Sequence, residues 1–323
     1  MTAGTMPVTA GTALVIGHGS IGARHQRVLA ELGLRVGVVS RRGGAGRFTD
    51  LAEALAALAP GYVVVATETA DHGPALERLA ALDFRGRVLV EKPLFAAPRP
   101  LPAHRFQALA VGYNLRFHPV LQRLSELLAG ERPVSAQLYV GQYLPEWRPE
   151  RDYRALYSAH AAGGGGALRD LSHELDVAGW LFGPWRRVAA LGGRWGDLEI
   201  DSDDTFALLG EFVRCPAVTI QMNCLDRRSR RELVVNTARH TVSADLIAGT
   251  LQWDRDAPER FAPDRDLTYR ALHRAVLGDL PGPCGAEEGA RAVALIAAAE
   301  RAAREGAWVA AGATPPPFPL PPP

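Results

Sequence analysis

The stretch "VIGHGSIGARH", residues 15–25, decides the fold of the first half of the chain. It follows a short apolar run and contains the pattern G-x-G-x-x-G. Glycines in this pattern allow a tight turn and close backbone approach, while the start of the next helix offers free N–H groups to a pyrophosphate. The stretch therefore predicts a strand, a turn and a helix over Ser20–Leu32, with a dinucleotide held by Gly17, Gly19, Ser20, Ile21 and Gly22.

Short apolar runs alternate with amphipathic runs from Ala13 to Tyr113. Alternation of β-type and α-type segments with short connections indicates a parallel sheet covered by helices on both faces. The fold class expected here is α/β, a doubly wound Rossmann domain over residues 12–113.

The pattern changes after Tyr113. A helix is expected over Pro119–Leu128 and a strand over Val134–Val140, and later apolar runs between residues 186 and 246 follow one another with hairpin-sized gaps. Such gaps indicate a largely antiparallel sheet. Residues 114–313 are thus predicted to form an α+β domain. Its final helix, about Ala286–Arg304, is a candidate to pack back on the first domain. Residues 1–11 are expected to be a disordered tail and residues 314–323 a proline-rich tail.

Composition excludes several classes of function. The chain has 323 residues and a formal net charge of +1, so no overall field draws it to nucleic acid or to a membrane surface. Three cysteines without a C-x-x-C pair argue against a disulfide framework or a thiolate metal site and are expected to be small buried fillers. A cytoplasmic protein is the expectation, since neither a signal peptide nor a long apolar span is present.

The end of the second predicted strand bears on the cofactor. NAD-binding proteins usually place an acidic residue there to bind the ribose 2′-hydroxyl, whereas this chain has Ser40, Arg41 and Arg42. Guanidinium groups pair with phosphate in a bidentate fork. NADP is therefore the favoured cofactor, with NAD as the alternative and ordinary solvated loop charges as the other explanation of these arginines.

Five motifs in order resemble the Gfo/Idh/MocA family of NAD(P)-dependent oxidoreductases. They are the glycine motif, "ATETADH" (66–72), "VEKPL" (90–94), "GYNLRFHP" (112–119) and "GGGGALRDLSHELD" (163–176). The resemblance implies hydride transfer between nicotinamide and a secondary alcohol or ketone of a sugar, sugar nucleotide or cyclitol. It also implies a homo-oligomer formed through the C-terminal open sheet, and no metal. Further cofactor contacts implied by these motifs are Thr67, His72, Glu91 and Lys92.

The resemblance assigns the catalytic roles to Lys92 and His173. Lys92 would hydrogen-bond the reacting oxygen, and the Lys92–Pro93 bond could be cis. His173 is the better proton acceptor because the unperturbed pKa of imidazole lies near neutrality. Asp170, three residues before His173 where many relatives have four, could orient His173 or cap the helix.

The run after the four glycines is predicted to be one amphipathic helix. Asp170, His173 and Asp176 share its polar side, opposite Leu171, Leu175, Ala178 and Phe182. The glycines are expected to let the backbone pass close to substrate.

Further substrate contacts are predicted from polar and aromatic residues near the motifs. Candidates are Asn114, Arg116, His118, Trp147, Arg148, Arg154 and Tyr157, and a domain-linking or surface role is the alternative for each. Asp176 is a further candidate, and orienting His173 or making a structural hydrogen bond are its alternatives. Two rival functions remain open at this stage: a glycosidase that uses transient oxidation, and a non-catalytic dinucleotide-binding sensor.

Overall fold

The first domain is built on a six-stranded sheet with strand order β14-β5-β4-β3-β1-β2. The computed structural model describes residues 11–312 except 263, 279 and 281, so both predicted tails lie outside the described residues apart from Gly11. Strands β1 to β5 are parallel, as predicted. The elements of this part of the chain are β1 (Thr12–Ile16), α1 (Ser20–Glu31), β2 (Arg35–Val39), α2 (Leu51–Leu58), β3 (Tyr62–Val65), α3 (His72–Ala81), β4 (Arg87–Val90) and β5 (Ala108–Val111).

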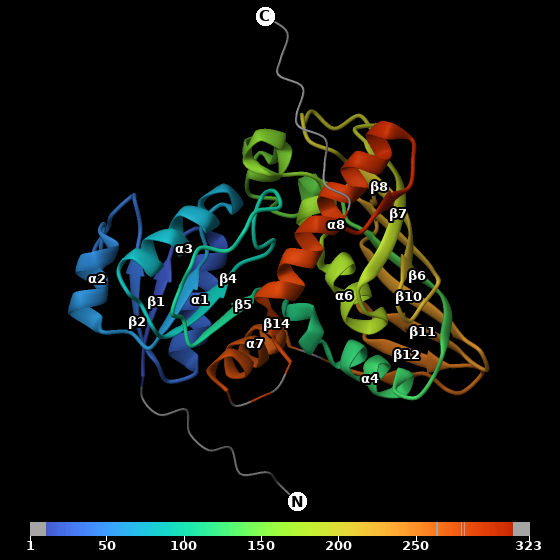
Figure 1. Cartoon of the computed structure of the whole chain (residues 1–323), viewed down its shortest axis with the longest axis horizontal. Helices are drawn as coiled ribbons and strands as arrows, with labels where there is room; N and C mark the ends of the chain where they lie inside the picture. The colour runs from blue at the N-terminus through green and yellow to red at the C-terminus, as the bar shows by residue number, and fades with distance from the viewer. Residues whose placement is uncertain (1–10, 263, 279, 281, 313–323) are drawn as a thin grey trace, which may run out of the picture.

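Both faces of this sheet are covered because its strands are apolar on both sides. One face packs with Leu29 of α1 and Leu272 of α7 (Leu267–Leu277). The other packs with Leu76 of α3, with α2, and with Val293 of α8 (Ala286–Glu305). The doubly wound arrangement expected from the sequence is confirmed (Figure 1).

The domain boundaries differ from those predicted. Helix α7 and strand β14 (Cys284–Gly285) come late in the chain but belong to the first domain, where β14 pairs with β5. Helix α8 joins both cores, because Val293 packs in the first and Leu295 in the second. Residues 267–285 therefore have to be added to the nucleotide domain, and the predicted return of the final helix is confirmed.

The second domain contains a nine-stranded sheet with order β13-β12-β11-β10-β6-β9-β8-β7-β15. All neighbouring strands are antiparallel except β6 and β9, which agrees with the prediction. The strands are β6 (Pro133–Gly141), β7 (Trp185–Gly193), β8 (Thr205–Phe212), β9 (Ala217–Asn223), β10 (Arg230–Thr237), β11 (Thr241–Asp245), β12 (Thr250–Trp253), β13 (Glu259–Arg260) and β15 (Val309–Ala310).

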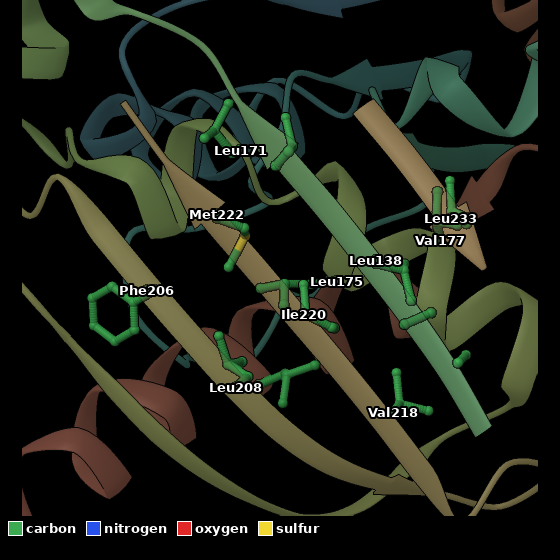
Figure 2. Packing of buried hydrophobic residues seen from close by; sticks show 14 of the residues in the cluster. Leu138, Leu171, Leu175, Val177, Phe206, Leu208, Val218, Ile220, Met222 and Leu233 are labelled. Carbon is green, nitrogen blue, oxygen red and sulfur yellow. The ribbon is translucent and has the colours of Figure 1, made fainter. Parts of the chain in front are cut away.

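One face of this sheet carries the second core. Side chains such as Leu138, Leu208 and Ile220 point from neighbouring strands toward Leu175 of helix α6 (His173–Phe182) (Figure 2). Helix α4 (Pro119–Leu128) and the second half of α8 cover the same face. Burial alternates along β8 and β9 because successive side chains point to opposite faces. The three cysteines are buried and unpaired, as expected.

The segment after the four glycines is two helices rather than one. Helix α5 (Ala167–Asp170) ends before Leu171, and α6 begins at His173. Asp176 and Val177 are buried because α6 lies between the second sheet and α8. The predicted polar face that joined Asp170, His173 and Asp176 is therefore wrong.

Candidate active site

The glycine motif forms a tight turn between β1 and α1. Gly17 has φ +94°, and a Cβ there would lie 2.6 Å from the Ala66 carbonyl oxygen. A Cβ on Gly22 would lie 2.0 Å from the Gly17 oxygen, whereas one on Gly19 would meet nothing within 4 Å. No side chain caps the start of α1. Two glycines are thus required by packing, and the open side of the third, next to Ser20 and Ile21, fits an anionic diphosphate.

The end of β2 carries the residues predicted to select the cofactor. Ser40 is buried, and its N–H donates to the Phe48 oxygen, which folds the following loop back on β2. Arg41 and Arg42 are exposed, and Arg41 forms an ion pair of 3.0 Å with Asp71. Because this pair is exposed, it leaves Arg41 free to rearrange toward a ligand.

Residues after β3 and β4 line the same edge of the sheet. Thr67 has a buried hydroxyl without a hydrogen-bond partner in the described structure, so it fits a ligand contact. His72 instead lies between the carbonyl oxygens of Pro93, at 3.0 Å, and Thr67, at 3.3 Å, and burial lowers its pKa. This geometry favours a structural role for His72 over direct cofactor contact.

Lys92 lies at the carboxyl end of β4, and the Lys92–Pro93 bond is cis. Its Nζ donates to the Asp170 carbonyl oxygen at 2.7 Å, across the two domains. Lys92 is also the only lysine in the chain, since arginine fills the other 35 of its 36 lysine and arginine positions. An ammonium group is a compact point charge, unlike the planar guanidinium, so this position is chemically distinct from the others.

His173 is the first residue of α6. Its ring contacts the edge of Tyr113, with 5.7 Å between centroids, and its Nδ1 has no partner among the described atoms. Burial, followed by the positive charges of Lys92 and Arg231, lowers the pKa of His173 well below its ordinary value. The imidazole is therefore neutral near pH 7 and able to accept a proton, whereas the sequence suggested titration near neutrality.

Asp170 ends α5 and does not cap either helix, so the capping alternative is wrong. Its Oδ1 accepts a hydrogen bond from the Tyr157 hydroxyl, and its buried Oδ2 has no partner in the part of the chain that the structure describes. The backbone carbonyl of Asp170 thus contacts Lys92, and its side chain contacts Tyr157.

The last two of the four glycines pack tightly against protein. A Cβ on Gly165 would lie 2.3 Å from the Tyr157 oxygen, and one on Gly166, where φ is +120°, would lie 2.2 Å from the Asp203 carboxylate. Asp203 also accepts the N–H of Leu168 at 2.8 Å. Gly165 and Gly166 thus bring α5 close to the 157–158 loop and to Asp203, and the expected approach of the backbone to substrate stays a prediction.

Two predicted substrate contacts pair with each other. Arg116 donates to both oxygens of Asp176, at 2.9 and 2.7 Å, and to Glu288 at 2.9 Å. Arg116 is 3% exposed and Asp176 4% exposed. Asn114 is also buried and donates to the Thr268 hydroxyl at 2.8 Å. All three side chains join the chain after β5 to later helices, which favours the domain-linking alternative.

The remaining predicted contacts divide between the site and the surface. The indole Nε1 of Trp147 is buried without a partner in the described region, and Arg148 is half-buried. Arg154 is exposed and forms ion pairs with Asp152 and Glu199, as a surface residue would.

Sequence reasoning missed Arg231 on β10. Burial and, after it, the charge of Arg231 lower the pKa values of His173 and His118. The buried Nδ1 of His118, which the sequence did suggest as a substrate contact, lacks a partner among the residues described. Arg231 also forms a 2.8 Å ion pair with Glu174. No sequence signal ties β10 to this site, because the two segments meet only in the folded sheet.

The family profile of the GFO/IDH/MocA C-terminal domain matches residues 127–243. This match agrees with the resemblance to the Gfo/Idh/MocA family over that part of the chain. A sequence search of curated proteins gave no significant match. Among solved structures, GenD2 from gentamicin A biosynthesis, in complex with NAD, has 26% identity and a TM-score of 0.79, covering 97% of this chain and 99% of that one.

Two more distant structures share the fold of this chain. The WlbA dehydrogenase from Bordetella pertussis, in complex with NADH and UDP-GlcNAcA, has 20% identity and a TM-score of 0.75, covering 96% and 99% of the two chains. The UDP-N-acetylglucosamine 3-dehydrogenase GnnA from Acidithiobacillus ferrooxidans has 19% identity and a TM-score of 0.74, covering 92% and 98%. Within the described residues, no helix is long and apolar enough to cross a membrane.

Proposed function

We propose that the chain is an NAD(P)-dependent oxidoreductase that interconverts a secondary alcohol and a ketone on a sugar, sugar nucleotide or cyclitol. The observation that carries the proposal is the meeting of Lys92 with the Asp170–His173 segment, where a single lysine lies beside a neutral, unpartnered imidazole. GenD2 and the WlbA dehydrogenase are in complex with NAD and NADH. WlbA and GnnA are named with a sugar-nucleotide ligand or substrate.

The cofactor would be held by the glycine turn, by Thr67 and by the arginines after β2. A nicotinamide dinucleotide supplies or accepts the hydride. We favour NADP over NAD because Ser40, Arg41 and Arg42 stand where a ribose-binding carboxylate is usual.

The protein's own residues handle the substrate oxygen and its proton. Lys92 would donate a hydrogen bond to that oxygen and stabilise negative charge on it as it develops. His173 would take the hydroxyl proton at Nδ1 during oxidation and return it during reduction. Tyr157 and Asp170 would hold the adjoining wall, while Trp147, Arg148 and Arg231 are the proposed contacts to the rest of the substrate.

The outer face of the second sheet supports the expected homo-oligomer. Leu191 and Leu209 are 64% and 43% exposed on neighbouring strands β7 and β8. Large exposed apolar side chains on an open sheet favour contact with another protein surface.

The test is a panel of sugar nucleotides, sugar acids and cyclitols, each offered with NADP and with NAD. Reduction of the dinucleotide by one class, lost in His173→Gln while dinucleotide affinity is retained, is the expected result. If compounds of the panel raise the melting temperature but none reduces the dinucleotide, the dehydrogenase proposal is wrong, because ligand stabilisation reports binding alone.

A further inference from the structure

Four buried polar side chains form a continuous hydrogen-bonded chain through the first domain. Glu91 Oε1 lies 2.9 Å from His25 Nε2, His25 Nδ1 lies 3.0 Å from His273 Nε2, and His273 Nδ1 lies 2.8 Å from the Tyr62 hydroxyl. Both histidines are 0% exposed and Tyr62 is 1% exposed. Buried polar groups are costly unless they are paired, and each of these is paired by the next.

The partners allow one arrangement of protons that satisfies every member. An ionised Glu91 only accepts, so His25 carries its proton on Nε2 and accepts at Nδ1. His273 must then donate from Nε2 and accept at Nδ1, and the Tyr62 hydroxyl is the donor that completes the chain. A charged His25 would reverse the last two bonds and leave the Tyr62 hydroxyl proton without an acceptor among the described residues.

Burial favours the neutral forms of two members. Burial raises the pKa of Tyr62 well above its usual value, so the phenol stays protonated. Burial also lowers the pKa of His273 well below its usual value. Burial alone would raise the pKa of Glu91, but its contact with His25, followed by the charge and the backbone N–H of Lys92, holds it below the ordinary range.

The other oxygen of Glu91 reaches the catalytic lysine. Glu91 Oε2 accepts the backbone N–H of Lys92 at 3.1 Å. The carboxylate also packs against β5, because a Cβ on Gly112 would lie 2.9 Å from Glu91 Oε1. Movement of the Glu91 side chain therefore alters the backbone that aims Lys92.

We propose that Tyr62, His273 and His25 are positioning residues that lock the Glu91 carboxylate and, through it, set the direction of Lys92. Tyr62 begins β3, next to Arg87, whereas Glu91 follows Val90 at the opposite end of β4. The hydrogen-bonded series of side chains thus connects the amino edge of the sheet with its carboxyl edge, over roughly four residues or about 13 Å of strand. The last step, from Lys92 to turnover, rests on the proposed function.

The hydrogen-bonded series of side chains does more than fill space in the core. Apolar side chains of similar volume would fill the same space without the desolvation cost of four polar groups. Three of the four members stand on α1, β3 and α7, and only Glu91 adjoins the site. Helix α7, which comes from the second half of the chain, is thereby tied to the edge that carries Lys92.

The first experiment reads the histidine tautomers without any substrate. In protein labelled with ¹⁵N-histidine, His25 should carry a proton on Nε2 and His273 should appear as a neutral Nε2–H tautomer between pH 6 and 8, with assignment by His25→Gln and His273→Gln. Tyr62→Phe, which removes only the donor oxygen, should convert His273 to a mixture of tautomers. A mixed or Nδ1–H tautomer of His273 in the unaltered protein would overturn the lock.

The second experiment uses Lys92 as its own reporter. Because the chain has one lysine, protein labelled with ¹³C,¹⁵N-lysine gives a single side-chain signal. Tyr62→Phe should shift or broaden that signal. Tyr139→Phe is the matched control, since it also removes a hydrogen-bonded hydroxyl, the one donated to Asp226, but on β6 of the other sheet. If the Lys92 signal is the same in Tyr62→Phe as in the unaltered protein, the hydrogen-bonded side chains do not position Lys92.

The third experiment separates hydrogen bonding from packing. His25→Gln keeps an amide donor within reach of Glu91, whereas His25→Met keeps volume without a donor. We expect kcat to fall on the order of tenfold or more in His25→Met, with dinucleotide affinity and KM retained, and to recover in His25→Gln. Equal loss in both variants would contradict the lock. If the Lys92 signal responds as expected while no panel compound is oxidised, the lock stands and the proposed function fails.

Discussion

The ammonium group of Lys92 donates to the carbonyl oxygen of Asp170 over 2.7 Å, which joins the end of β4 to the helix pair that carries His173. Neither domain contains the site alone. The nucleotide domain supplies the lysine, and the second domain supplies the imidazole and the wall formed by Asp170 and Tyr157.

Replacing Lys92 by Arg tests whether the position of the ammonium donor matters. Arginine keeps the positive charge but is bulkier and has a planar group of donors. Turnover should fall by roughly a hundredfold or more, as expected when a donor to the developing negative charge is displaced. Fluorescence titration should show that dinucleotide affinity is kept. Turnover close to that of the unaltered enzyme would remove Lys92 from the chemistry.

The pH dependence of alcohol oxidation should show His173 acting as a base of low pKa. Oxidation needs the neutral imidazole, so activity is present above the pKa of His173 and is lost as the pH falls through it. Because burial and two positive charges lower this pKa, the acid limb of kcat/KM should lie well below pH 6.5. Arg231→Gln should move the limb upward, since one of these charges is removed. A limb at or above pH 6.5 would contradict the assignment.

Cofactor preference should depend on the arginines after β2. The double variant Arg41→Ala/Arg42→Ala should lose about tenfold or more in NADP affinity, because a hydrogen bond to a charged group contributes about 1.5–3 kcal/mol. NAD affinity should stay the same. Arg85→Ala, which removes an exposed arginine paired with Asp83, is the matched control in the same titration. Equal affinities for the two dinucleotides in the unaltered protein would end the NADP proposal.

The pair between Arg116 and Asp176 should contribute to stability rather than to substrate binding. Asp176→Ala leaves a buried guanidinium unpaired on that side, so unfolding in urea should show a loss of about 3–5 kcal/mol. Glu31→Ala, which breaks the exposed pair with Arg27, should change stability little. A raised KM without any loss of stability would restore the substrate role that the sequence suggested for Asp176.

The close contact between Gly166 and Asp203 should make glycine indispensable there. Gly166→Ala places a Cβ 2.2 Å from the Asp203 carboxylate at φ +120°, and we expect a loss of about 1–3 kcal/mol or more. Gly179→Ala is the control, because its Cβ would meet nothing within 4 Å inside α6, where alanine is favoured by about 1 kcal/mol. Equal thermal midpoints for the two variants would contradict the packing argument.

Local signals predicted the regular elements well. The glycine motif located α1 to within one residue of its end, and helix α4 has the predicted bounds. Helix α7 was not predicted from the sequence, although Leu272, Ala275 and Val276 have helical spacing. His273, which lies on that helix, was therefore not identified from the sequence either. The break between α5 and α6 was also missed, because the apolar spacing of residues 171–182 continues across it.

The sequence by itself determined the two sheet types and the dinucleotide turn, because period and glycine spacing are local properties, and its motifs predicted Lys92 and His173 as the catalytic pair. Tertiary structure alone decided what those residues meet. Arg116 and Asp176 neutralise each other, Arg231 approaches His173 from β10, and His25 and His273, far apart in sequence, share one hydrogen bond. These partners are set by how the two sheets and α7 fold together, which the spacing along one chain does not reveal.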